Sequence, residues 1–182
     1  MVIGDLDSIS DKAREFYSAR GVKILKDPCQ ESTDFGKGLG QLLSVLEPDG
    51  SGHRDILILG SISGRVDQGL GLLHEILRET TNNENLRLWL FSEQNVSFVL
   101  SKGHHTIETP LRTNALDYHF GVIPVYGPAV ISTEGLRWDS KDWDTRMGLR
   151  VSTSNHVIAE AVQIVTTSEV LVTIELGSAV IA

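Results

Sequence analysis

The sequence contains a single cysteine, Cys29, so no disulfide bond can form within the chain. This scarcity fits a reducing compartment, and a lone cysteine is more often an ordinary small side chain than a catalytic nucleophile. Apolar runs long enough to span a bilayer are absent, and residues 1–5 lack the basic start and long apolar stretch of a signal peptide. We therefore expect a cytoplasmic protein with no membrane partner.

Positive charge is also scarce, since 16 Lys and Arg face 24 Asp and Glu for a net charge of -8. Nucleic acid needs a basic face to neutralise its phosphates, so this balance argues against it as the main partner. A small phosphorylated ligand remains possible because a bound cation reverses the local field. The 182 residues, 41% of them hydrophobic, suffice for one large globular domain or two small ones.

Two hydrophobic patterns divide the chain. Helices are expected at residues 12–20, 33–46 and 65–79, and strands at 22–25, 55–60 and 86–91. Later runs predict strands at 96–100, 104–109, 118–126, 130–136, 159–167 and 170–176. The fold class is thus α/β plus all-β. We predict a three-layer α/β domain with a mainly parallel sheet over residues 1–95, and an antiparallel β-sandwich or barrel over 96–182.

Acidic residues follow apolar runs at two turns of the first third. Asp5 and Asp7 are separated by one residue, so on an extended backbone their carboxylates point the same way and suit Mg²⁺. The competing interpretation is a turn in which aspartate caps its own backbone. Asp34 follows Ser32-Thr33 at a predicted helix start, where a capping role competes with a role at a ligand site.

A glycine-serine loop joins the strand that ends at Gly60 to the helix that starts near Arg65. Backbone N–H groups of such a loop, around Ser61 and Gly64, can cradle phosphate, and Arg65 can grip phosphate oxygens with two hydrogen bonds. The spacing is not that of a P-loop. Asp67 can bind metal or orient Arg65, and the alternative is a tight turn with a solvated ion pair.

Two segments of the second half carry further candidates. Trp138 offers a flat face to an aromatic or cationic ligand. Ser152-Thr153-Ser154-Asn155 is expected to be a polar turn that supplies hydroxyl and amide groups. The alternative is a tryptophan that covers the core beside an ordinary loop. The sequence shows no zinc-type Cys/His spacing and no nucleophile elbow.

Taken in order, these segments resemble the thiamin pyrophosphokinase family. The resemblance rests on Gly4 to Ser8, Gln30, Thr33 to Lys37, Gly60 to Gln68, Thr133 to Trp138 and Ser152 to Asn155. It implies Mg²⁺-dependent transfer of a pyrophosphoryl group from ATP to the hydroxyl of thiamin, giving thiamin diphosphate and AMP. It also implies a catalytic domain, a thiamin-binding domain, and a homodimer with active sites between subunits.

The resemblance also assigns roles to individual residues. Four aspartates match catalytic positions, namely Asp5, Asp7, Asp34 and Asp67, and the first three match metal ligands. Positions for ATP and its phosphates are Gly60, Ser61, Gly64, Arg65, Thr33 and Lys37, and thiamin-binding positions are Gln30, Trp138, Ser152, Ser154 and Asn155. Transfer of this kind depends on positioning and charge neutralisation. One aspartate is expected to accept the hydroxyl proton, and the sequence leaves open which one.

The beginning of the chain departs from the family pattern. Val2-Ile3 enters the acidic turn at once, whereas the family has an earlier strand and an Asp-Gly-Gly segment. We expect that an upstream segment is missing. Two alternatives therefore stand beside the enzyme: a catalytically impaired thiamin- or nucleotide-binding module, and another metal-dependent phosphotransferase or phosphohydrolase.

Overall fold

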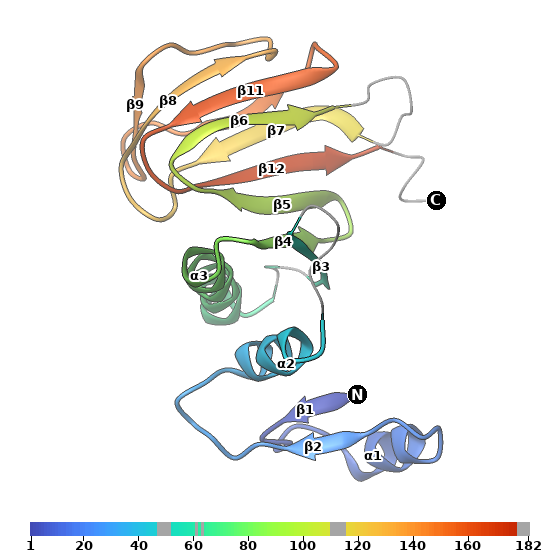
Figure 1. Ribbon diagram of the computed structural model, residues 1–182. Coiled ribbons are helices and arrows are strands. Elements are labelled where there is room, and N and C mark those ends of the chain that lie inside the picture. The colour runs from blue at the N-terminus through green and yellow to red at the C-terminus, as the bar shows by residue number, and fades with distance from the viewer. Residues whose placement is uncertain (47–51, 61, 63, 110–115, 178–182) are drawn as a thin grey trace. The chain divides into compact units, whose positions relative to one another are not determined.

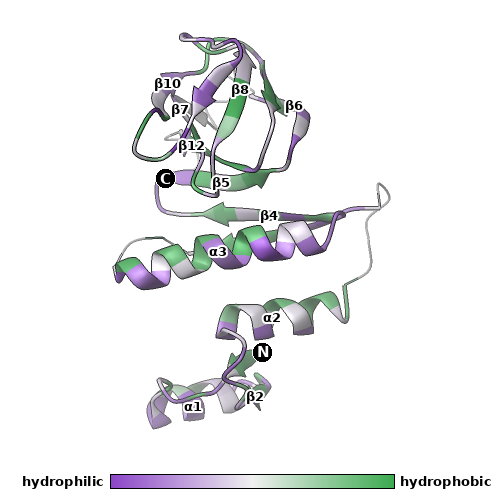
Figure 2. Ribbon diagram, turned by 90° about the vertical axis from the view of Figure 1, so that its left-hand side faces the viewer, coloured by the Kyte–Doolittle hydropathy of each residue, from purple (hydrophilic) through white to green (hydrophobic). Residues whose placement is uncertain are grey.

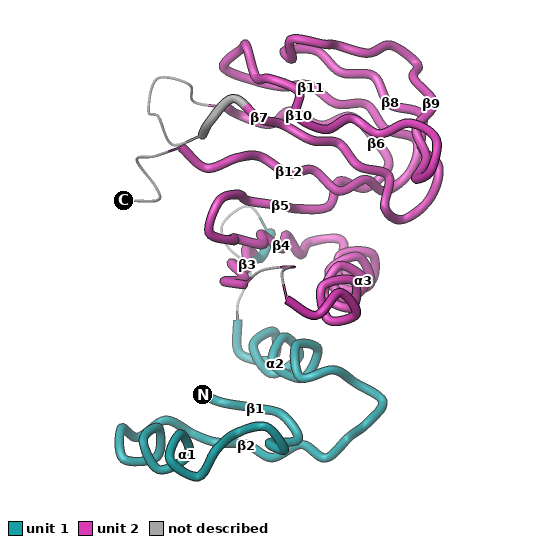
Figure 3. The backbone as a smooth tube through the Cα atoms, turned by 180° about the vertical axis from the view of Figure 1, so that it is seen from behind, with its two compact units in different colours: residues 1–54 teal, residues 55–182 magenta. Residues whose placement is uncertain are grey.

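The computed structural model describes residues 1–46, 52–60, 62, 64–109 and 116–177 (Figure 1). The chain forms two compact units, residues 1–54 and 55–182, which are distinguished in Figure 3. Within the described ranges, no helix has both the length and the apolar character needed to cross a bilayer.

The first unit contains a two-stranded sheet and two helices. In chain order these are β1 (Val2–Gly4), α1 (Asp11–Ser18), β2 (Ile24–Lys26) and α2 (Asp34–Leu43). The two strands are parallel, with Val2 opposite Ile24. Parallel neighbours need a crossover connection, and α1 provides it.

Both helices of the first unit begin at a side-chain cap. The hydroxyl of Ser10 accepts a hydrogen bond from the N–H of Ala13 at 3.2 Å, and that of Thr33 accepts one from Gly36 at 3.0 Å. Each bond satisfies an N–H that has no partner inside the helix. The cap of α2 is therefore Thr33. Asp34 is the first helical residue, so the interpretation of Asp34 as the cap is wrong.

The second unit begins within β3 and is rich in strands. Its elements are β3 (Arg54–Leu59), α3 (Val66–Asn82), β4 (Leu86–Phe91), β5 (Asn95–Leu100), β6 (Gly103–Glu108), β7 (Leu116–Ile123), β8 (Ala129–Glu134), β9 (Trp143–Thr145), β10 (Ser152–His156), β11 (Ala161–Thr166) and β12 (Val170–Leu176). One sheet has the order β10-β7-β12-β5-β4-β3, and the other has the order β6-β11-β8-β9.

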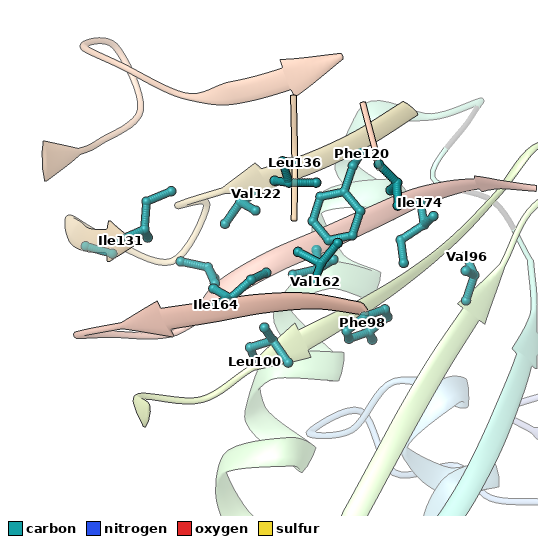
Figure 4. Packing of buried hydrophobic residues seen from close by; sticks show 14 of the residues in the cluster. Val96, Phe98, Leu100, Phe120, Val122, Ile131, Leu136, Val162, Ile164 and Ile174 are labelled. Atoms are coloured by element: carbon teal, nitrogen blue, oxygen red, sulfur yellow. The ribbon is translucent and has the colours of Figure 1, made fainter. Parts of the chain in front are cut away.

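Among the described residues, a hydrophobic cluster packs between these two sheets (Figure 4). Val172 and Ile174 of β12 and Phe120 of β7 come from the larger sheet, whereas Ile164 of β11 and Ile131 of β8 come from the smaller one. Neighbouring strands of this core pair antiparallel, as β12 does with β5 and β7. Alternate residues point inward because successive side chains of a strand face opposite sides.

Helix α3 packs against β4 and β5. Hydrophobic and hydrophilic bands alternate along it in Figure 2, as expected for a helix with one covered face. Leu73 and Ile76 lie on the buried side, and the hydroxyl of Tyr126 donates a hydrogen bond to the carbonyl of Leu73 at 3.1 Å. This bond ties the helix to the β-rich part of the same unit.

The coarse prediction of an α/β part followed by a β-rich part is confirmed. The prediction of a turn at residues 152–155 is wrong, because β10 pairs there with β7. The strand was missed because its polar sequence lacks apolar alternation and its register shifts between Ser152 and Asn155.

β4 and β5 lie on either side of the predicted boundary at residue 95, yet they are neighbours in one sheet. The division into a catalytic and a thiamin-binding part stays a prediction.

Candidate functional site

The turn of residues 5–7 that follows β1, called the acidic turn below, lies next to Asp34. The backbone N–H of Asp5 donates to Oδ1 of Asp34 at 3.2 Å. The N–H of Asp7 donates to Oδ1 of Asp5 at 3.1 Å, and Leu6 between them has a φ of 62°. The backbone therefore turns, so the extended arrangement of Asp5 and Asp7 is wrong. The competing interpretation, in which aspartate caps its own turn, is confirmed for Asp5.

Gly4 makes this approach of Asp34 possible. A Cβ at residue 4 would lie 2.7 Å from both Cγ and Oδ2 of the Asp34 carboxylate. Real Cβ atoms do not come so close to other heavy atoms, so only glycine fits without a shift. The N–H of Asp27 also donates to the carbonyl of Gly4 at 2.8 Å, which fixes the end of β1. Strand, turn and helix start are thus held together at one point.

Lys37 lies directly beneath this turn, on α2. Its side chain is only 3% exposed, and its Nζ lies 3.0 Å from the carbonyl oxygen of Asp27 and 3.3 Å from Oδ1 of Asp34. The ammonium therefore neutralises the Asp34 carboxylate from the buried side. The assignment of Lys37 as a phosphate ligand stays a prediction, and the observed contacts show that Lys37 also holds Asp34.

The Asp5 carboxylate is favoured in its ionised form. Its pKa is lowered mainly by the hydrogen bond from the backbone N–H of Asp7, with smaller contributions from the charge of Lys37 and the amide of Gln30. Gln30 is exposed and also donates to the carbonyl of Pro28 at 3.3 Å. Gln30 thus lies beside the acidic turn, while the hydroxyl of Thr33 serves as the helix cap.

The side chains at the acidic turn determine which cation it could hold. Among the described residues, no group of three or more Asp, Glu, His or Cys side chains is arranged to hold an ion. Asp34 and Asp7 are exposed and Asp5 is half-buried. This suits Mg²⁺, which keeps several waters and uses one or two carboxylates together with substrate phosphates. The donor chemistry fits, and the assignment of Asp5, Asp7 and Asp34 as metal ligands stays a prediction.

The glycine-serine loop between Gly60 and Arg65 lies in the second unit. Nε of Arg65 lies 3.1 Å from Oδ1 of Asp67, and Nη2 lies 2.5 Å from Oδ2. The pairing raises the pKa of Arg65 and lowers that of Asp67, mainly through the side-chain hydrogen bonds. Gly64 has a φ of +85°, a conformation that favours glycine. Ser61 lies outside the described residues, and Gly60 directly follows β3, with its N–H bonded to the carbonyl of Phe91 at 3.0 Å.

Trp138 is exposed and lies beside a row of two histidines, His156 and His119. The residue is 58% exposed, so the interpretation of Trp138 as a cover for the core is wrong. The ring of His156 lies 5.4 Å from that of Trp138 and 5.0 Å from that of His119. Nδ1 of His119 is in turn hydrogen-bonded to the carboxylate of Glu175. Strands β10, β7 and β12 supply the two histidines and the glutamate, because they are neighbours in the sheet.

An open pocket of about 350 Å³ adjoins this row. Its lining residues are Gln94, Asn95, His119, Phe120, Gly121, Thr153, Ser154, Thr173 and Glu175. Ser154 has a φ of 54°, which belongs to the bulge of β10. Of the predicted thiamin-binding residues, Ser154 lines the pocket. Ser152 lies opposite Val122 on β7, and Asn155 is buried behind Trp138.

His119 and Glu175 were missed in the sequence because they belong to no motif. They are 56 residues apart and meet only because β7 and β12 pair. The sole signal in the sequence was the prediction of both strands, which gave no register.

Comparison with known proteins identifies the family. Residues 1–90 match the model of the thiamin pyrophosphokinase catalytic domain, and residues 104–171 match the model of the thiamin pyrophosphokinase vitamin B1 binding domain. The chain belongs to the thiamin pyrophosphokinase family. The two family domains follow one another in the order that the sequence resemblance predicts.

Named relatives agree with this membership. The chain is 33% identical to thiamine pyrophosphokinase 1 of Oryza sativa subsp. japonica over 180 residues, which are 97% of this chain and 66% of the relative. It is 31% identical to thiamine pyrophosphokinase 1 of Arabidopsis thaliana over 179 residues, which are 97% of this chain and 65% of the relative. The chain thus spans slightly less than two thirds of the length of these family members.

Solved structures of family members share the fold. The thiamin pyrophosphokinase from Candida albicans superposes with a TM-score of 0.84 at 22% identity, covering 96% of this chain and 72% of that one. The yeast thiamin pyrophosphokinase gives the same TM-score at 24% identity, covering 96% of this chain and 68% of that one.

Proposed function

We propose that this chain is a thiamin pyrophosphokinase, which transfers a pyrophosphoryl group from ATP to the hydroxyl of thiamin and releases AMP. The observation that carries the proposal is the match of one chain to both the catalytic and the vitamin B1 binding domain of the family. The names of the plant relatives support the same reaction.

On the ATP side, the acidic turn is the proposed cation site. Asp5, Asp7 and Asp34 would hold Mg²⁺, which would supply positive charge to neutralise the phosphates. The chain itself contributes orientation, since the Asp5 N–H and the Lys37 ammonium both contact Oδ1 of Asp34. A fixed carboxylate loses little freedom when it takes up its ligand, which is how positioning lowers a barrier.

Arg65 is the proposed phosphate ligand of the second unit. Its Nε and Nη2 are bonded to Asp67, which leaves the N–H groups of Nη1 for a phosphate. Asp67 thus orients the guanidinium, one of the two roles that the sequence left open. The N-terminus of α3 follows directly and has no side-chain cap at Arg65, so its N–H groups favour an anion.

On the thiamin side, the exposed ring of Trp138 is the proposed face for the thiazolium cation. Ser154 and the pocket it lines would supply hydrogen bonds to the second ring of the vitamin. Aromatic faces attract cations through the ring quadrupole, and hydroxyl groups recognise ring nitrogens and amino groups.

The finer organisation belongs to the same proposal. Residues 1–95 would form the three-layer α/β catalytic domain, and residues 96–182 the β-sandwich that binds thiamin. The family matches at 1–90 and 104–171 support these limits. We also propose a homodimer in the cytoplasm. Light scattering on the purified protein would give twice the 20.0 kDa of one chain, and a value of one chain would contradict the dimer.

The experiment that tests the function is product analysis after incubation with ATP, Mg²⁺ and thiamin. The proposal predicts thiamin diphosphate and AMP in equal amounts. Thiamin monophosphate with ADP would indicate a different phosphotransferase. Hydrolysis of ATP without any thiamin product would indicate a phosphohydrolase, and thiamin binding without turnover would indicate a binding module.

A further inference from the structure

Both polar atoms of the Asn155 side-chain amide are bonded to the backbone around Trp138. Its Oδ1 accepts hydrogen bonds from the backbone N–H of Trp138 at 3.1 Å and of His156 at 2.8 Å. Its Nδ2 donates to the carbonyl of Trp138 at 2.9 Å. The residue is only 5% exposed. Both kinds of polar atom in the amide are therefore used on backbone.

The side-chain amide of Asn155 bonds to the backbone of Trp138 as a neighbouring strand would. A peptide group offers one donor and one acceptor, and the side chain of asparagine offers the same pair. Because it bonds both the N–H and the C=O of Trp138, Asn155 fixes the residue as a partner in a β-ladder would. Aspartate has no donor for that carbonyl, and serine is too short to span both groups.

The rest of the loop is held in the same way. The N–H of Arg137 donates to the carbonyl of His156 at 2.8 Å, and Leu136 forms a bridge with Val157. The carboxylate of Asp139 accepts the N–H groups of residues 135 and 136 at 3.1 and 3.0 Å. The backbone around Trp138 is therefore fixed on both sides, while its ring stays exposed beside the ring of His156.

From this arrangement we propose that Asn155 is a positioning residue, which acts on the vitamin only through the orientation of Trp138. The inference rests on the proposed function, because it takes Trp138 as the thiamin-binding face. It changes the role that the family resemblance implies for Asn155, from a residue near thiamin to the support of one. A held ring loses less freedom on binding, so loss of the support should weaken thiamin binding without affecting ATP.

The test is a double-mutant cycle of Asn155→Asp and Trp138→Ala, read as KM for thiamin and for ATP. Asn155→Asp alone should raise KM for thiamin about tenfold, because it leaves the Trp138 carbonyl facing a carboxylate. KM for ATP should stay unchanged. In the Trp138→Ala background the same change should alter KM for thiamin less than about twofold. Two independent effects that multiply would show that Asn155 touches thiamin and would overturn the inference.

Two further measurements keep the test decisive. Asn155→Ser breaks the paired contacts to the N–H and the C=O of Trp138 without adding a buried charge, in case the aspartate variant does not fold. Asn83→Asp is the matched control, since Asn83 Nδ2 also donates to a backbone carbonyl, that of Glu79 at 3.1 Å, and it should leave KM for thiamin unchanged.

Fluorescence separates this inference from the proposed function. In a Trp89→Phe/Trp143→Phe protein only Trp138 emits, so added Asn155→Ser should lower its anisotropy and increase its acrylamide quenching. Unchanged anisotropy and unchanged acrylamide quenching of Trp138 would overturn the inference. An intact protein that binds no thiamin would defeat the proposed function, while the fluorescence result would still decide whether Asn155 holds Trp138.

Discussion

The carboxylate of Asp34 accepts the backbone N–H of Asp5 at 3.2 Å, although the two residues are 29 positions apart. This bond joins the turn after β1 to the first residue of α2. It places one carboxylate at the positive end of a helix and next to a second one, while Lys37 neutralises it from the buried side. Such an arrangement holds the Asp34 carboxylate in a fixed position beside Asp5.

Asp34→Asn tests the catalytic importance of this carboxylate. The amide keeps an oxygen for the Asp5 N–H but removes the charge that a cation needs, so turnover should fall about tenfold or more. Asp11→Asn is the matched control, because Asp11 is likewise the first residue of a capped helix. Both variants lose the same helix-dipole contribution, about 0.3–1 kcal/mol. Equal turnover in the two variants would contradict the role of Asp34.

Gly4→Ala tests the close approach of Asp34 to β1. The added Cβ would lie 2.7 Å from the carboxylate, so unfolding free energy should fall by about 1–3 kcal/mol. Gly40→Ala in α2 is the control, since a Cβ there meets no atom within 4 Å and should stabilise the helix by up to about 1 kcal/mol. Urea denaturation of both variants measures the difference. Equal stabilities would refute the contact.

Arg65→Gln tests the Arg65–Asp67 pair. The pKa of Asp67 lies below its ordinary value of 3.8 because Arg65 bonds to the ionised form. The contribution of the pair to stability is therefore complete above that ordinary pKa, and it is lost as the pH falls through the lower folded value. In the variant the pKa of Asp67 should rise toward 3.8, which an NMR titration of the carboxyl carbon measures. An unaltered titration would show that the pair is not formed in solution.

Trp138→Leu tests the aromatic face. Leucine keeps apolar bulk but has no quadrupole, so KM for thiamin should rise roughly three- to thirtyfold, while KM for ATP stays constant. Trp138→Phe is the matched control and should retain most of the affinity. A rise confined to KM for ATP would assign Trp138 to the other substrate.

The sequence was sufficient to predict elements with strong periodicity. The helix expected at 65–79 is α3, and the strand expected at 86–91 is β4. Local polar chemistry was harder to assign, since Thr33 and Asp34 are both good caps and only the structure shows which one accepts the N–H of Gly36. The serine-rich β10 was read as a turn because its pairing with β7 depends on strand register rather than on hydrophobic alternation.

The contacts of Asn155 and His119 could not be predicted for a related reason. Asn155 bonds to Trp138, 17 residues away, and His119 contacts Glu175, 56 residues away. Motif order indicated that Asn155 lies near the vitamin, but it could not distinguish a residue that contacts a ligand from one that holds its neighbour. That distinction requires the positions of side-chain atoms.

The most direct test of the central claim uses ATP labelled with ³²P in either the β or the γ phosphate, with Mg²⁺ and thiamin. Transfer of an intact pyrophosphoryl group predicts that both labels enter thiamin diphosphate to the same extent, with one AMP released for each molecule formed. Label from the γ phosphate alone, or release of both labels as free phosphate or pyrophosphate, would contradict the account.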